Sequence, residues 1–211
     1  MHPNPIYRSS HSPEDISFLQ DRGFGVLAVN GDAGPLLSHI PFQLSPDTIY
    51  IEAHLVRSNP IWRALSEGPL SAVMAVSGGD SYVSPDWYDM PDQVPTWNYV
   101  AVHLRGTLRQ LPQEELLGIL ERLSGEFERR LMPKPPWLIT KMTPDALERM
   151  LRQIVPIALD IHSIEGTWKM SQNKPAPVRA GVVQGLATSP IGQNVSQISD
   201  LMSAALKEVT P

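Results

Sequence analysis

The sequence predicts a β-rich α+β fold, an antiparallel barrel with helices at its periphery. Around six segments are apolar or alternate apolar and polar residues, as strands do. Turn residues such as Asn30-Gly31 and Ser45-Pro46 separate neighbouring segments, which favours antiparallel connections. The helical segments fall between the strands without regular βαβ alternation, so a doubly wound parallel sheet is not expected.

The first half of the chain predicts a helix and then a meander of strands. Ser12 can cap a helix that starts at Pro13 and runs to about Gln20, and Asp15 can complete a capping box. A second short helix is expected to start at Ser58-Asn59-Pro60 and to end near residue 67. The strands expected in this half are 23–30, 36–44, 48–55 and 70–77.

The second half begins with a segment, 78–95, whose Pro, Asp and Gly content predicts a long irregular connection. The following segment predicts a strand on which Trp97 and Tyr99 share one face and Asn98 lies on the other. Residues 174–186 favour neither helix nor strand. The other elements expected are a strand at 96–110, helices at 112–131, 145–153 and 194–208, and a last strand at 158–169.

Length and composition indicate a folded, soluble protein of one domain with a small appendage. The chain has 211 residues, 42% hydrophobic and 18% charged, with no stretch long and apolar enough to span a membrane. We expect a barrel domain at 1–187 and a tail helix of unassigned function at 188–211. The chain has no cysteine, which excludes disulfides and thiolate sites, and it shows no secretory signal, so a cytoplasmic location is expected.

Four short runs carry side chains suited to a ligand. Trp97, Asn98 and Tyr99 combine flat faces with an amide, although aromatic residues at this spacing also pack in cores or dimer contacts. The run His54-Leu55-Val56-Arg57-Ser58-Asn59 leads from a strand end into a helix start, where free N–H groups and an arginine favour an anion. Asn59 also serves there as a simple helix cap.

The other two runs are Ser38-His39 on a strand and Lys169-Met170-Ser171-Gln172-Asn173 after the last strand. A lone histidine on a strand is also consistent with a structural role. The second run suits an anion or a polar heterocycle edge, and equally a hydrated turn.

Several other classes of site lack their motifs. There is no G-x-G-x-x-G or Walker-A run, no His-x-x-x-His spacing for zinc, and no nucleophile elbow. No helix-turn-helix with a basic second helix is visible, and the formal net charge is −5, from 17 Lys and Arg against 22 Asp and Glu. A basic footprint for nucleic acid over the whole chain is therefore absent.

Taken in order, these runs resemble the PaiB family, often described as FMN-binding negative transcriptional regulators. The resemblance covers about residues 7–186 and departs at Val56 and Met170, where Ala and Leu are expected. The matching runs are Leu37-Ser38-His39-Ile40-Pro41-Phe42, His54 to Pro60, Ser84-Pro85-Asp86-Trp87-Tyr88, Val94-Pro95-Thr96-Trp97-Asn98-Tyr99 with Val102-His103 and Gly106, and Trp168 to Asn173.

The resemblance implies a split β-barrel, related to pyridoxamine-phosphate oxidase-like proteins, that forms a homodimer with FMN at the subunit interface. Arg57, Ser58 and Asn59 would hold the phosphate, with His54 near it. The other residues that the resemblance implies as FMN contacts are Ser38, His39 and Ile40 along the ring edge, Trp97, Asn98 and Tyr99 around the ring, and Lys169, Ser171, Gln172 and Asn173 closing the site.

Two alternatives stay open at this point. A flavin-dependent oxidoreductase using NADH or NADPH would draw on His39, His54 or His103 as acid or base. A haem-binding split barrel would need a histidine ligand. A direct DNA contact follows from the family description alone, and the acidic balance of the chain counts against strong non-specific binding.

Overall fold

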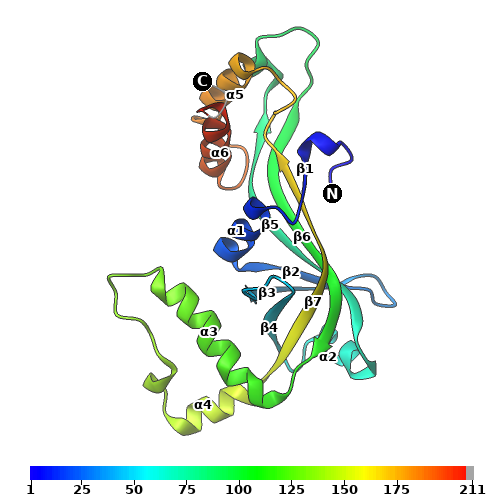
Figure 1. The fold of residues 1–211 in the computed structure, drawn as a ribbon, viewed down its shortest axis with the longest axis vertical. Helices are drawn as coiled ribbons and strands as arrows, with labels where there is room; N and C mark the ends of the chain where they lie inside the picture. Colours follow the sequence, from blue (N-terminus) through cyan, green and yellow to red (C-terminus); the bar gives the residue numbers. More distant parts are fainter. Residues whose placement is uncertain (208–211) are drawn as a thin grey trace. The chain divides into compact units, whose positions relative to one another are not determined.

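The computed structural model describes residues 1–207 (Figure 1). The strands are β1 (Arg8–Ser10), β2 (Phe24–Val29), β3 (Leu36–Leu44), β4 (Tyr50–Val56), β5 (Leu70–Val83), β6 (Thr96–Gln110) and β7 (Ile154–Lys169). The α-helices are α1 (Pro13–Arg22), α2 (Pro60–Ala64), α3 (Leu116–Arg129), α4 (Pro144–Leu151), α5 (Ala176–Leu186) and α6 (Val195–Lys207). Short 3₁₀ turns lie at η1 (Pro5–Tyr7), η2 (Leu65–Glu67), η3 (Pro85–Tyr88), η4 (Gln113–Glu115) and η5 (Ile139–Lys141).

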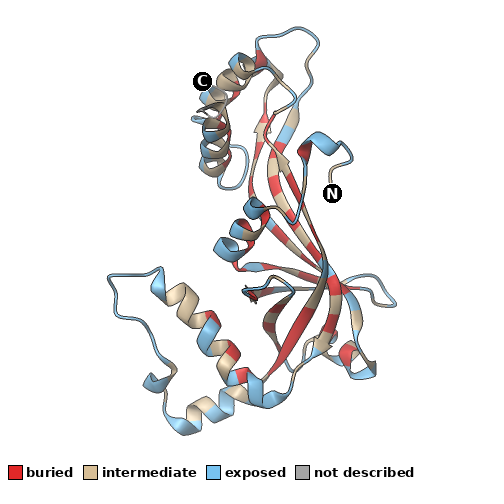
Figure 2. Cartoon of the chain, viewed as in Figure 1, coloured by how far each residue is buried: buried red, intermediate tan, exposed pale blue. Residues whose placement is uncertain are grey.

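Six strands close into an antiparallel barrel in the order β7-β4-β3-β2-β5-β6, with β6 returning to β7. The short strand β1 pairs with β7 as a seventh strand. Buried and less buried residues alternate along the strands (Figure 2), and the buried set includes Leu27, Phe42, Ile51, Leu104 and Ile157. The predicted fold class, an antiparallel split barrel with peripheral helices, is confirmed.

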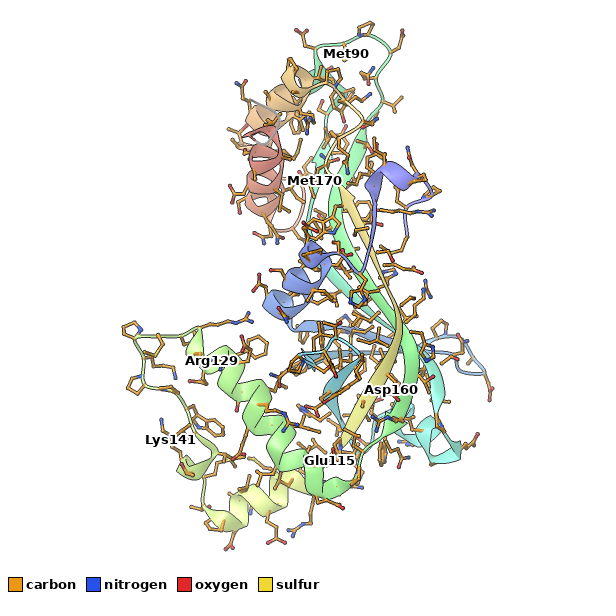
Figure 3. All side chains as sticks on the ribbon, in the orientation of Figure 1. Met90, Glu115, Arg129, Lys141, Asp160 and Met170 are labelled. Atoms are coloured by element: carbon orange, nitrogen blue, oxygen red, sulfur yellow. The ribbon has the colours of Figure 1, made fainter. Side chains whose placement is uncertain are left out.

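The closing seam between β6 and β7 depends on a glycine. A Cβ atom on Gly106 would come within 1.9 Å of the Asp160 carbonyl oxygen, so no larger residue fits without moving the strand pair. Beside it, Arg109 donates two hydrogen bonds to the Asp160 carboxylate, at 2.8 and 3.1 Å. Figure 3 labels Asp160 on β7.

The chain folds into two compact units, each assembled from separate segments. Unit 1 comprises Met1–Asp15, Ser77–His103 and the described residues from Glu165 onward. Unit 2 comprises Ile16–Val76 and Leu104–Ile164, and holds β2, β3 and β4 entire. The domain boundary predicted near residue 187 stays a prediction.

Unit 1 also contains the helix-start motif predicted at the N-terminus. The Asp15 amide donates to Ser12 Oγ at 3.2 Å, and the Ser12 amide donates back to Asp15 Oδ2 at 3.2 Å. The fully buried Asp15 carboxylate also accepts from Ser9 Oγ at 2.6 Å and Trp168 Nε1 at 2.9 Å. The predicted capping box is confirmed, and it anchors β1 and the end of β7 to one carboxylate.

The prediction that 78–95 is one irregular connection was wrong over its first part, because β5 continues to Val83. The glycines that suggested a turn instead allow close approach. A Cβ atom on Gly79 would lie 2.7 Å from the Asn194 carbonyl oxygen. Further along, Asp80 donates its amide to the Gln193 carbonyl at 2.8 Å, so this part of β5 is bordered by the segment before α6.

The remaining differences from the predicted elements concern bounds. The strand predicted at 158–169 begins at Ile154, and residues 174–186, which favoured neither assignment, contain helix α5. The predicted tail helix is α6, whose Ile198 and Met202 are buried; its predicted last residue, Glu208, lies outside the described residues. Among the described residues, no helix has both the length and the apolar content needed to cross a membrane.

Candidate functional site

In unit 2, the predicted runs Ser38-His39 and His54 to Asn59 meet at the start of α2. Asn59 is the N-cap of this five-residue helix, since its Oδ1 accepts from the Ile61 amide at 2.9 Å. The other half of the same amide, Nδ2, donates to Ser38 Oγ on β3 at 3.0 Å. The structure therefore brings Ser38 and Asn59 together and also shows that Asn59 has a capping role.

Arg57 is exposed, and part of its guanidinium group is already bound. Its Nε donates to the Arg152 carbonyl at 3.0 Å and its Nη2 to Gln113 Oε1 at 3.1 Å. A guanidinium has five N–H donors, so Nη1 keeps its donors for an additional acceptor. These contacts hold the side chain in one orientation beside the β4–α2 turn.

A second cation, which the sequence analysis did not single out, lies at the same turn. Arg63 on α2 donates from Nη2 to the Ser58 carbonyl at 3.2 Å. Ser58 itself is exposed, and its hydroxyl has no hydrogen-bond partner among residues 1–207. The four-residue spacing from Asn59 to Arg63, one helical turn, is the sequence signal that could have identified this arginine.

The remaining predicted residues of unit 2 differ in exposure. Ile40 is buried in the barrel and His39, its neighbour on β3, is exposed. His54 is partly buried on β4, opposite Pro156 of β7, and its Nδ1 atom is buried without a hydrogen-bond partner. Desolvation by burial lowers the pKa of His54 below its ordinary value of 6.5, which favours the neutral imidazole.

The outward side chains of three adjacent strands form an apolar surface, the outer sheet face. Across β3, β2 and β5, His39 is in register with Val26 and Val26 with Ala75, and Leu37 aligns with Ala28 in the same way. Leu37 is 61% exposed and Phe24 37%. The outer sheet face comprises Phe24, Val26, Ala28, Leu37, His39, Pro41, Val73 and Ala75.

In unit 1, the alternation along β6 separates the predicted aromatic run. Asn98 is fully buried, and its amide is hydrogen-bonded to Ser171 Oγ at 3.1 and 3.3 Å and to Met202 Sδ at 3.4 Å. Trp97 points the other way and is 46% exposed, and its ring meets the Tyr82 ring edge-on, with the two ring centroids 6.3 Å apart. Asn98 is therefore part of the wall of unit 1, whereas Trp97 presents an open aromatic surface.

The predicted run that follows β7 borders a cavity of about 410 Å³ within unit 1. Figure 3 labels Met170, which is buried at this strand end. Lys169 Nζ donates to the Trp97 carbonyl at 2.7 Å and to Thr96 Oγ1, and burial lowers its pKa. The cavity is lined by His2, Asn4, Tyr7, Tyr88, Asp92, Gln93, Val94, Thr96, Asn98, Lys169, Ser171, Asn173 and Lys174.

The other residues of this run have separate roles. Gln172 closes the turn, because its Oε1 accepts from the Met170 amide at 2.7 Å and its Nε2 donates to the Trp168 carbonyl at 2.5 Å. Ser171 takes a left-handed conformation, with φ of 55°, and turns its hydroxyl toward Asn98. Asn173 is exposed at the cavity without a hydrogen-bond partner.

The structure thus gathers eight of the predicted residues into one cluster in each unit. Ser38, Asn59, Ser58 and Arg57 lie around the β4–α2 turn, while Asn98, Lys169, Ser171 and Asn173 line the cavity. The residues that sequence reasoning missed at the cavity include Tyr7 and Lys174. Lys174 directly follows the run that had been identified, whereas Tyr7 is more than 160 positions away in sequence. Among the described residues, no group of three metal-binding side chains is arranged to hold an ion.

A family model described as "Putative FMN-binding domain" matches residues 1–163 of the chain. The curated relatives include "Protease synthase and sporulation protein PAI 2" of Bacillus subtilis, 30% identical over 207 residues that cover 97% of this chain and 98% of the relative. An uncharacterized protein of Emericella nidulans is 29% identical over 222 residues, covering 84% and 88%.

Solved structures share the fold at low identity. The FAD and heme binding protein from Mycobacterium smegmatis has a TM-score of 0.56 and 19% identity, with 88% of this chain and 82% of that chain covered. The flavocytochrome Anf3 from Azotobacter vinelandii has a TM-score of 0.52 and 11% identity, covering 80% and 72%. The family match spans most of this sequence. It contains strands β1 to β6 entire and the part of β7 up to Ser163. The chain therefore belongs to this PaiB-like family of FMN-binding split barrels, and its cofactor is FMN.

Proposed function

We propose that the chain works as a homodimer that holds FMN at its subunit interface, with the flavin phosphate at the β4–α2 turn. The observation that carries this proposal is the family match over residues 1–163, which contains Ser38, Arg57 and Trp97 and all their neighbouring predicted residues. The run Lys169-Met170-Ser171-Gln172-Asn173 lies outside that match, so we leave it out of the proposed FMN contacts.

The β4–α2 turn fits a phosphate group. The free donors of Arg57, the exposed hydroxyl of Ser58 and the nearby guanidinium of Arg63 give two cations and a hydroxyl around one backbone turn. Arginine suits phosphate because its planar group can donate two parallel hydrogen bonds. The held orientation of Arg57 reduces the entropy that the side chain loses when it binds.

The flavin ring would use flat surfaces and polar strand edges. Trp97 offers an exposed indole, and Tyr99 lies two residues further along β6 on the same side. Ser38, His39 and Ile40 would follow the ring edge through side-chain and backbone groups. Asn98 is buried and its amide is satisfied within unit 1, so we assign it no direct flavin contact.

The homodimer would cover the outer sheet face. An apolar surface of this kind, built from the outward residues of three paired strands, is typical of a protein–protein contact. A two-fold dimer places the same surface on both partners, so a self-complementary apolar sheet face suits it. His39 lies within that surface, which would bring a predicted flavin contact to the interface between the two subunits.

Titration of the apoprotein with FMN, followed by flavin fluorescence, tests the phosphate assignment. Replacing Arg57 by Ala is expected to weaken FMN binding about tenfold, because a charge-assisted hydrogen bond of about 1.5 kcal/mol is lost. The control is Arg149→Ala, which removes an equally exposed arginine from α4. Equal FMN affinity in the two variants would remove Arg57 from the phosphate site.

The flavin's chemistry and any regulatory role need separate measurements. Bleaching of bound FMN by NADH or NADPH under anaerobic conditions, with turnover on an electron acceptor, would establish an oxidoreductase. The spectrum of the purified protein separates flavin from haem. A DNA shift assay at low salt tests direct repression. If the protein does not shift DNA, any regulatory effect is indirect. The predicted cytoplasmic location stays a prediction.

A further inference from the structure

The cavity of unit 1 has the size of a small-molecule site. Its volume of about 410 Å³ falls within the range of roughly 300–1,000 Å³ that is common for ligand pockets. It brings together the N-terminal segment with Tyr7, the segment after β5 with Tyr88, the first residue of β6, Thr96, and the turn after β7. Three stretches far apart in sequence, 2–7, 88–98 and 169–174, therefore contribute residues to one pocket.

Two ammonium groups enter this cavity without an acidic partner. Lys169 Nζ donates to the carbonyl of Trp97 and the hydroxyl of Thr96, and Lys174 Nζ donates to Gln93 Oε1. All three acceptors are neutral, and neither lysine takes part in an ion pair within the described part of the chain. Each ammonium has three N–H donors, so one remains on Lys169 and two remain on Lys174.

Tyrosine rings help to hold both ammonium groups in place. Lys169 Nζ lies 5.9 Å from the centroid of the Tyr7 ring, and Lys174 Nζ lies 5.2 Å from that of Tyr88. These cation–π contacts fix the direction of the charges without neutralising them. The one carboxylate that lines the cavity, Asp92, is exposed, so the net charge offered to a ligand is positive.

The cavity wall adds a neutral donor that suits an oxyanion. The side-chain amide of Asn173 is exposed and has no hydrogen-bond partner among the described residues, whereas the Ser171 hydroxyl already donates to Asn98 Oδ1 at 3.3 Å. The exposed side chain of Val94 and the Tyr7 ring supply apolar surface for the body of a ligand. A charged head between the lysines and a compact apolar body would both be accommodated.

We propose that this cavity binds a small organic carboxylate, with the carboxylate group held by Lys169 and Lys174. The proposal goes beyond FMN binding, because it assigns a second ligand to residues that the proposed phosphate and ring contacts do not use. A carboxylate supplies the negative charge that the two ammonium groups lack, and its oxygens accept the donors that remain on them.

Isothermal titration of the FMN-loaded protein with benzoate, succinate and acetate tests the proposal, with benzamide as the neutral match to benzoate. We expect at least one acid to bind and benzamide to bind at least tenfold more weakly. Lys174→Met should lower the affinity for the acid about tenfold or more and leave FMN affinity unchanged, whereas Lys174→Arg should retain most of it. Lys141→Met, an exposed lysine of unit 2, should change neither.

Three results would overturn the proposal. One is the absence of binding by all three acids, and another is equal binding of benzoate and benzamide. The third is loss of FMN binding in Lys169→Met, or displacement of FMN by the acid, because the cavity would then belong to the flavin site. Circular dichroism of each variant establishes that it is folded. The Arg57→Ala titration tests only the proposed phosphate site, and the acid titrations test only the proposed carboxylate site. The two proposals can therefore fail independently of each other.

Discussion

A single histidine, His54, combines burial with an unsatisfied ring nitrogen. Its Nδ1 atom has no hydrogen-bond partner, and the residue opposite it on β7 is Pro156, which has no N–H group to donate. Burial therefore destabilises the charged imidazolium, and no contact compensates for the lost hydration. As a result, the pKa of His54 falls below 6.5. At neutral pH the ring is neutral and keeps one nitrogen as an acceptor.

This lowered pKa predicts a loss of stability on acidification. Because the unfolded chain has the higher pKa, it takes up the proton first as the pH falls below about 6.5. The free energy of unfolding should therefore decrease from there until the pH passes the folded pKa. In the variant His54→Gln, the free energy of unfolding measured by urea titration should change less with pH between about pH 7 and pH 5. An NMR titration that places the folded pKa at or above 6.5 would contradict the prediction.

Residue types and periodicity were enough to predict the candidate residues, although not all their partners. The pairing of Ser38 with Asn59 joins two runs that both contained ligand-like side chains, so each could be found from local sequence. The contacts of Arg57 with Gln113 and with the Arg152 carbonyl could not, because they depend on how η4 and the end of α4 pack beside the β4–α2 turn. The same holds for Tyr7 beside Lys169.

At the scale of elements, the bounds of strands were predicted best where polar and apolar side chains alternate. They were predicted worst where two backbone segments pack closely against each other. The predicted bounds of β3 and β6 match the structure, because polar and apolar residues alternate along their whole length. β5 was cut short at Gly78, since glycine pairs indicate turns when only local sequence is considered. The structure uses Gly79 for close approach to Asn194 instead, a contact that no local pattern encodes.

Helix α5 shows a similar use of glycine and gives a matched test. A Cβ atom on Gly185 would come within 2.3 Å of the Trp87 ring, so Gly185→Ala forces α5 away from η3. We expect this variant to destabilise the protein by roughly 1–3 kcal/mol, as overpacked sites do. Gly125→Ala in α3 meets nothing within 4 Å and should stabilise it by up to about 1 kcal/mol through helix propensity.

Urea unfolding of both variants measures the contrast. The two substitutions are chemically identical and both lie within helices, so helix propensity favours alanine at each site. The difference between them therefore reports the contact of α5 with Trp87. If Gly185→Ala proved as stable as Gly125→Ala, the packing of Trp87 against α5 would be looser than the structure has it.

For the whole molecule, the distribution of apolar surface bears on assembly more than its net charge does. The chain carries a formal charge of −5, which keeps copies soluble without preventing a specific contact. The outer sheet face is apolar over three strands, and its one polar member is His39. Burying this surface in a dimer removes apolar area from water, at about 25 cal/mol for each Å².

The variant Leu37→Asp tests both the homodimer and the interface position of the flavin. A carboxylate on the outer sheet face cannot be buried against a second copy without a partner charge, so the dimer should dissociate. Light scattering should then give a mass near 23.4 kDa instead of twice that value, and FMN affinity should fall with it. Leu138→Asp is the control, because Leu138 is 59% exposed against 61% for Leu37 and lies on the α3–α4 connection. A wild-type protein that stays monomeric at micromolar concentration would refute the dimer, whereas a monomeric Leu37→Asp with full FMN affinity would refute only the interface placement of the flavin.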